Sequence, residues 1–160
     1  MPVFRSLQTI AVGKTIFLSF VWTYVTAILP MLIYSIHISD AGIYFIVQRF
    51  FLIYAICIIF DYRDKHEDKA SGIKTLITGL SDRGIDKLFY GSLIAFLLFS
   101  ILLYTEDFSI LVHILLFIPG IITLVLYKKA KNNHSDYLYY GILDGLMMVS
   151  ALFTSLPWIK

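Results

Sequence analysis

The sequence predicts an all-α membrane protein, and three observations support this fold class. Hydrophobic residues make up 59% of the 160 residues, charged residues only 15%, and the mean hydropathy is +0.81. A soluble domain carries far more charge. The apolar runs are long rather than alternating, which indicates membrane-spanning helices instead of strands. We therefore expect a single helical membrane domain that covers residues 1–160.

Five apolar segments each approach the roughly 17–25 residues that cross the hydrocarbon core of a bilayer. Lys14 precedes the first segment, which contains Pro30 near its far end. The second segment leads directly into Asp61. The predicted spans cover residues 15–36, 41–60, 88–104, 108–127 and 137–158.

The polar links between these spans differ in charge, and this difference predicts the orientation of the chain. The links at 37–40 and 105–107 are short and contain no lysine or arginine. The links at 61–87 and 128–136 are basic, and five alternating spans place both on the same side as the N-terminus. The positive-inside rule assigns that side to the cytoplasm and the C-terminus to the outside.

The link at 61–87 opens with the densest group of charges in the sequence. Asp61, Asp64 and Asp68 are spaced i, i+3 and i+7, so on a helix they lie within about 60° of one another. Carboxylates on one face repel each other unless a cation lies between them. Oxygen ligands suit Mg²⁺, which usually completes its shell with water and phosphate oxygens. The spacing therefore predicts a site for Mg²⁺ and a diphosphate at the membrane surface.

The alternative interpretation of the three aspartates is a solvated helix end without a ligand. Aspartate is a poor residue for helix interiors, and the helix macrodipole disfavours it near a C-terminus. Three aspartates on one face are therefore costly without a cation, which favours the site.

Helix signals also occur in the rest of this link. We expect the helix of the second span to continue to about Lys69 and to end at Gly72. Ser81 and Asp82 predict the cap of a short helix or a turn before the third span.

The aspartates and the residues that follow them resemble a known family. Asp-x-x-Asp-x-x-x-Asp at the end of a membrane helix, followed by Lys-Ala-Ser-Gly-Ile-Lys-Thr-Leu at 69–76, is similar to the second aspartate-rich motif of the UbiA-type intramembrane prenyltransferases. In that nine-helix family two such motifs face each other and bind Mg²⁺ and the diphosphate of a prenyl donor. The C-terminal half of the family has two helices before the second motif and three after it, as predicted here.

Two departures from the family pattern change what the resemblance implies. The first motif, Asn-Asp-x-x-Asp-x-x-x-Asp, and about four preceding helices are absent from this sequence, and Ile77 stands where family members often have a proline. The chain therefore resembles the C-terminal half of such an enzyme. We expect a fragment, a split protein or a diverged half-protein that is inactive or nearly so without an N-terminal half.

The resemblance implies Mg²⁺-dependent transfer of a prenyl group from its diphosphate to a small, often aromatic, acceptor within the membrane. The three aspartates would bind the metal and the diphosphate, and no residue is expected to act as a general acid or base. Lys74, Lys65 and Lys69 would contact diphosphate oxygens, although the positive-inside rule alone also explains lysines here.

Two charged residues fall within the predicted spans. Asp144, beside Gly145 in the fifth span, is expected to face the bundle interior, where it would bond a neighbouring helix or line the cavity. Arg49 in the second span lies about 18 Å along a helix from Asp61. For Arg49 we expect a structural role, in which it snorkels outward or pairs with Asp40.

Two further classes of protein stay open. In a small membrane transporter, Asp144 and Arg49 would line the path of the transported substrate or ion. A non-catalytic membrane scaffold would associate with an N-terminal half instead. The predicted partners are a prenyl diphosphate, a small acceptor and membrane lipid, and basic residues occur only where topology requires them, which argues against nucleic acid.

Overall fold

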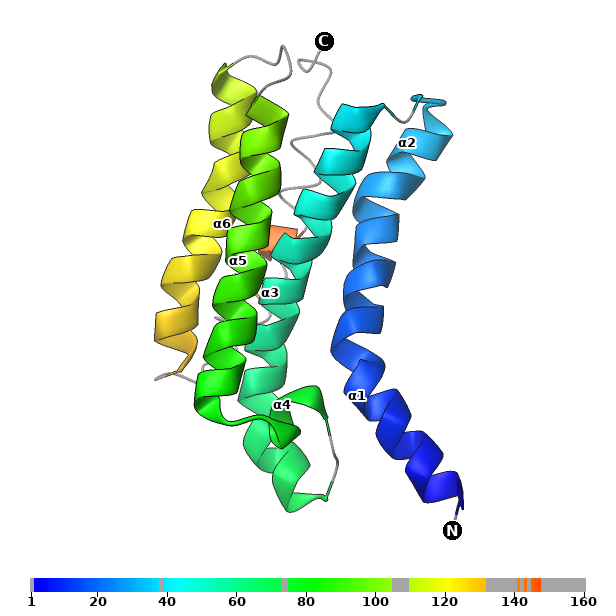
Figure 1. Cartoon of the computed structure of the whole chain (residues 1–160), viewed down its shortest axis with the longest axis vertical. Coiled ribbons are helices and arrows are strands. Elements are labelled where there is room, and N and C mark those ends of the chain that lie inside the picture. Colours follow the sequence, from blue (N-terminus) through cyan, green and yellow to red (C-terminus); the bar gives the residue numbers. More distant parts are fainter. Residues whose placement is uncertain are drawn as a thin grey trace.

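The computed structural model describes residues 2–37, 39–72, 75–104 and 110–131, together with 141, 143 and 145–147, and only the backbone of 2–12, 66, 67 and 111. The named elements in this part of the chain are all helical (Figure 1). They are α1 (Pro2–Thr23), the π-helix η1 (Tyr24–Ile28), α2 (Leu29–Ile33), α3 (Asp40–Ala70), α4 (Leu76–Gly79), α5 (Asp82–Tyr104) and α6 (Ile110–Ala130).

Four helical segments are long and apolar enough to cross a membrane. They are Gly13–Ile33, Asp40–Lys65, Asp82–Tyr104 and Val112–Ala130. These segments correspond to the first four predicted spans, and successive ones run in opposite directions (Figure 1). Most of the predicted fifth span at 137–158 lies outside the described residues, so the count of five stays a prediction.

The helix α3 lies at the centre of the bundle, where it contacts α1, η1, α4, α5 and α6. Seven of its eight residues from Leu52 to Ile59 are buried, and the exception, Tyr54, is half-buried. Phe89 and Phe96 of α5 join the same core. A helix that is apolar on every side is a buried helix, so this stretch explains why α3 is central.

The extension of α3 beyond the apolar segment confirms a sequence-based expectation. The helix has 31 residues, or about 46 Å, which exceeds the roughly 30 Å hydrocarbon core. Its last turns carry the three aspartates. Gly72 has a φ of +71°, which glycine adopts without a Cβ clash, and its N–H donates to the Lys69 carbonyl at 3.3 Å.

The link between α3 and α5 contains a short helix, α4, that the sequence did not predict. Thr75 and Thr78 form a reciprocal capping box around α4, and Ile77 within α4 is fully buried in the core. The Ser81 hydroxyl accepts a hydrogen bond from Gly84 N–H at 3.2 Å, which confirms it as a cap. The helix that Ser81 caps is α5 itself, so the third span continues without a break from Asp82.

The first span contains a π-helical turn, η1, that was not predicted. Pro30 follows this turn at the start of α2. Because proline has no N–H and its ring clashes with the carbonyl of Thr26, four residues earlier, the wider turn accommodates it. The chain leaves the helix at Ser35, which has a φ of +52°.

The contact between α5 and α6 depends on Gly120, which follows Pro119 in the middle of α6. A Cβ added to Gly120 would overlap the ring of Phe96, with the Cδ1 and Cζ atoms 2.9 Å away. The Thr123 hydroxyl donates to the Pro119 carbonyl at 2.8 Å, and α6 runs through the proline without ending. Glycine is thus required for the close approach of the two helices.

We expect Gly120→Ala to destabilise the bundle by about 1–3 kcal/mol, the usual cost of overpacking. The measurement is the thermal midpoint of the purified chain in detergent micelles. Gly13→Ala is the matched control, because a Cβ at Gly13 in α1 would meet nothing within 4 Å. Equal midpoints for the two variants would contradict the proposed contact.

Candidate functional site

One end of the bundle carries a concentration of basic residues. The start of α1, the end of α3, the start of α5 and the end of α6 all lie at the lower end in Figure 1. Their described basic side chains are Lys14, Arg63, Lys65, Lys69, Arg83, Lys87, Lys128, Lys129 and Lys131. Both basic links therefore lie at this end of the bundle where the structure describes them. The assignment of this end to the cytoplasm stays a prediction.

At this end, Asp61 lies where the apolar part of α3 gives way to its polar extension. Its carboxylate is half-buried and accepts a hydrogen bond from the hydroxyl of Thr15 in α1. Thr15 is almost fully buried. Lys14, the residue before it, attracts the carboxylate electrostatically. Asp61 is thus held in the contact between α1 and α3.

The other two aspartates continue along α3 from Asp61. Asp64 accepts a hydrogen bond from the neighbouring Arg63, with Nε and Oδ1 2.7 Å apart. Asp68 is half-buried. Both carboxylates lie close enough to Asp61 to repel it, which agrees with the predicted placement of all three on one side of the helix.

The chemistry of this aspartate face fits Mg²⁺, because all its donors are carboxylate oxygens. The face is nevertheless open, since Asp61 and Asp68 are separated by about 10 Å of helix. Within the described residues no group of three or more histidine, cysteine, aspartate or glutamate side chains is arranged to hold a metal ion. The face can therefore supply ligands from one side only.

The three candidate lysines have different surroundings. Lys65 forms an ion pair with Asp82 of α5 at 2.7 Å, and its Nζ lies 5.9 Å from the centre of the Tyr62 ring. Lys69 is exposed at the end of α3. Lys74 lies outside the described residues, as does the fifth-span candidate Asp144. Lys65 thus connects two helices, whereas Lys69 is accessible to a ligand.

A second polar cluster joins α3, α5 and α6 at the same end. Asp86 accepts hydrogen bonds from the Tyr127 hydroxyl at 2.5 Å and from Lys131. The Lys131 ammonium also lies 4.9 Å from the centre of the Tyr127 ring and 5.9 Å from that of Tyr62. These contacts hold the basic ends of three helices together.

Two polar side chains of α3, Gln48 and Arg49, are buried within the apolar segment Asp40–Lys65. Arg49 is 2% exposed, and it donates from Nε to the Thr26 hydroxyl at 3.4 Å and from Nη2 to the Met147 carbonyl at 2.7 Å. The expectation that Arg49 snorkels outward is therefore wrong, because neighbouring segments satisfy its guanidinium. Gln48 donates to the Ser100 hydroxyl at 2.8 Å.

The sequence did not predict that Thr15 bonds to Asp61 or that Thr26 bonds to Arg49. Both threonines belong to a line of buried hydroxyl residues in the first span: Thr15, Ser19, Thr23 and Thr26. The hydroxyls of the last three each donate to the carbonyl four residues earlier, at 2.7 Å. Their spacing of four, four and three residues places them on one helix face, and that periodicity was a readable signal for the side of α1 that meets protein.

A comparison of this chain with protein families, with curated proteins and with solved structures finds no match.

We expect Thr15→Val to lower the free energy of unfolding by about 1–3 kcal/mol, because the Asp61 carboxylate would lose its donor from α1. Thr23→Val is the matched control, since among the described residues its hydroxyl donates to the carbonyl of Ser19 in its own helix and to no other helix. Chemical or thermal unfolding in detergent micelles measures both variants. If Thr23→Val costs as much as Thr15→Val, the contact between Thr15 and Asp61 contributes nothing specific.

Proposed function

We propose that this chain provides one half of a membrane-embedded prenyl-transfer site, in which the aspartate face of α3 binds the diphosphate of a prenyl donor through Mg²⁺. The observation that carries the proposal is the row Asp61, Asp64 and Asp68, which directly follows the buried apolar stretch of α3. A prenyl diphosphate has the same two-part character, with a long apolar chain and a highly charged head. The substrate's two parts correspond to the two parts of this helix.

The surroundings of the three aspartates suggest different roles for them. Asp61 is anchored by Thr15, so it defines the boundary between the polar and apolar parts of the site. Asp64 and Asp68 lie further out, where they would be the ligands of the metal. Mg²⁺, when bound, would neutralise charge on the diphosphate leaving group. Lys69 and Lys74 would contact the diphosphate oxygens, while Lys65 is assigned to the ion pair with Asp82.

Aromatic side chains lie beyond Asp61 on the apolar side. Tyr54 is two helical turns from Asp61, and its ring stacks on Phe50 with centres 6.0 Å apart. Phe20 of α1 lies against Phe50 at 4.6 Å. Ring faces attract cations, and an apolar surrounding excludes water from a reactive cation. These rings would therefore shield and stabilise an allylic cation formed next to the diphosphate.

The open aspartate face supports the proposal that this chain supplies one half of the site. Since the three carboxylates supply ligands from one side only, a second set of ligands must face them for a metal and a diphosphate to be enclosed. The resemblance to the prenyltransferases implies that the opposing motif belongs to an N-terminal half. The described residues place Asp61, Asp64 and Asp68 on one helix, which agrees with that division.

A non-catalytic membrane scaffold or a small transporter is the second candidate, and Arg49 favours it. The guanidinium joins α3 to η1 and to the segment at 145–147 through Thr26 and Met147. Such an arrangement serves to hold segments together, and buried charges within a span often mark transport paths. Neither class requires a prenyl diphosphate to bind at the aspartates, so a binding measurement separates them from the first proposal.

The full chain in detergent micelles is expected to bind farnesyl diphosphate only when Mg²⁺ is present. Asp64→Asn and Asp68→Asn should each weaken binding by roughly tenfold or more, as expected for the loss of a charged ligand. Isothermal titration calorimetry measures the affinity, and EDTA removes the metal. Asp40→Asn is the matched control, because it removes the same charge from the opposite end of α3 and should change nothing.

Affinity that is unchanged in both Asp64→Asn and Asp68→Asn would refute the assignment of the metal ligands. Absence of any binding by the wild-type chain would favour the scaffold or the transporter.

Without an opposing acidic motif, we expect the 160-residue chain to transfer no prenyl group at a measurable rate. The assay is the transfer of radiolabelled farnesyl from its diphosphate to 4-hydroxybenzoate, followed by chromatography of the products. Efficient transfer by the chain alone would show that its own residues complete the site, and the half-site proposal would then be wrong.

A further inference from the structure

One face of α5 points away from the bundle and changes in character along its length. Its exposed residues, spaced by three or four positions, are Arg83, Lys87, Tyr90, Ile94, Leu98 and Ile101. This spacing places them in one stripe on the helix surface, called the α5 stripe below. The stripe begins with two cations, continues with a tyrosine and ends with aliphatic side chains.

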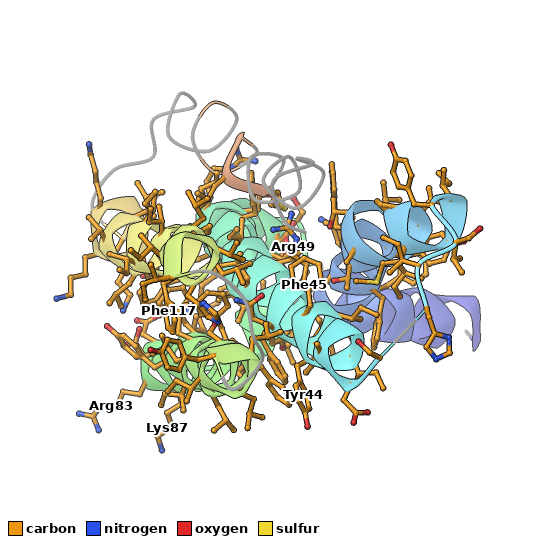
Figure 2. All side chains as sticks on the ribbon, turned by 90° about the horizontal axis from the view of Figure 1, so that it is seen from above. Tyr44, Phe45, Arg49, Arg83, Lys87 and Phe117 are labelled. Carbon is orange, nitrogen blue, oxygen red and sulfur yellow. The ribbon has the colours of Figure 1, made fainter. Side chains whose placement is uncertain are left out.

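The acidic and basic side chains at the start of α5 have different surroundings. Asp82 pairs with Lys65, and Asp86 pairs with Lys131. Arg83 and Lys87 instead point outward, as Figure 2 shows in a view from above. The two nearby carboxylates thus form ion pairs with lysines of other segments, and the Asp82 side chain is itself 70% exposed.

The two outward cations are in an electrostatically unfavourable place. Arg83 lies in the first turn of α5, where the positive end of the helix macrodipole repels a cation, and Lys87 follows one turn later on the same face. In the part of the chain that the structure describes, no ion pair joins either of them to an acidic residue. An anion from outside the chain would relieve both the repulsion and the uncompensated charge.

Gly91 leaves the α5 stripe without a side chain between the cations and the aliphatic residues, and this bare stretch of helix is called the gap below. It is exposed, and a Cβ added to it would meet nothing within 4 Å. It lies four residues after Lys87 and three before Ile94, beside Tyr90. Glycine weakens a helix relative to alanine, so the gap comes at a cost to α5.

We propose that the α5 stripe binds one anionic glycerophospholipid. Arg83 and Lys87 would hold its phosphate, because both donate hydrogen bonds and carry positive charge. The gap at Gly91, next to Tyr90, would take the glycerol and ester region. The acyl chains would lie along Ile94 and the aliphatic residues after it.

The order of residues identifies a membrane lipid as the occupant. A free phosphate ion would need only the two cations, whereas the stripe continues into the exposed aliphatic side chains Ile94, Leu98 and Ile101. Tyrosine is the residue type that membrane proteins place at the boundary between headgroups and chains. The α5 stripe is on a different helix from the aspartate face, so its test is independent of the proposed function.

The experiment is native mass spectrometry of the full chain released from micelles that contain phosphatidylglycerol or phosphatidylcholine with identical acyl chains. We expect one phosphatidylglycerol to be retained about tenfold more than phosphatidylcholine, given two cations near the headgroup. A third sample contains inorganic phosphate. If millimolar inorganic phosphate abolishes lipid retention, the occupant is a free anion and the proposal is wrong.

The double variant Arg83→Gln with Lys87→Gln should reduce the preference for phosphatidylglycerol to near one. The matched control is Lys128→Gln with Lys129→Gln, which removes the same charge at the same end of the bundle. In α6 these lysines lie in the last turn, where the macrodipole favours them, and their removal should leave the preference intact. If both double variants lose the preference for phosphatidylglycerol equally, the lipid is attracted by the overall charge of this end of the bundle, and the proposed site on the α5 stripe is wrong.

Gly91→Leu tests the gap without a change in charge. It should reduce the retention of both lipids several-fold, while circular dichroism shows that the helices are intact. Unchanged retention in this variant would remove Gly91 and Tyr90 from the site and contradict the proposed placement of the lipid.

Discussion

The burial of α3 on every side is the constraint on which the rest of the structure depends. From Leu52 to Ile59 every side chain except the half-buried Tyr54 lies in the core, so α3 leaves almost no surface for lipid or water at that level. The surrounding helices each need only one face to pack against it, and their other faces stay exposed. Gly120 extends this packing outward, since it lets α6 approach Phe96 on α5.

Polar contacts between helices determine how the packed helices are aligned. Gln48 bonds to α5 and Arg49 bonds to η1 inside the bundle, while Asp61 bonds to α1 at the basic end. Interhelical hydrogen bonds of this kind contribute about 0.6–2 kcal/mol each in membranes. Their larger effect is on register, because a shift of one turn would leave a buried polar group without its partner.

The basic end combines these contacts with an uneven distribution of charge. Asp82 and Asp86 pair with Lys65 of α3 and with Lys131, which follows α6, while Arg83 and Lys87 point out. The aspartates of α3 form a separate acidic face next to α1. An acidic face on one helix and a basic stripe on another give the same end of the bundle two surfaces, for which we propose a metal-bound diphosphate and a lipid headgroup as ligands.

The sequence by itself determined the helical membrane class, the first four spans, the continuation of α3 past Asp61 with its stop before Gly72, and the alignment of three aspartates, because these follow from composition and helical period along one segment. The sequence did not show that Lys65 pairs with Asp82, or that Arg49 turns inward to Thr26. Only the tertiary structure decided these contacts, because the partner of a buried polar group lies on another helix. Its identity depends on how the two helices are rotated and aligned, which local sequence does not encode.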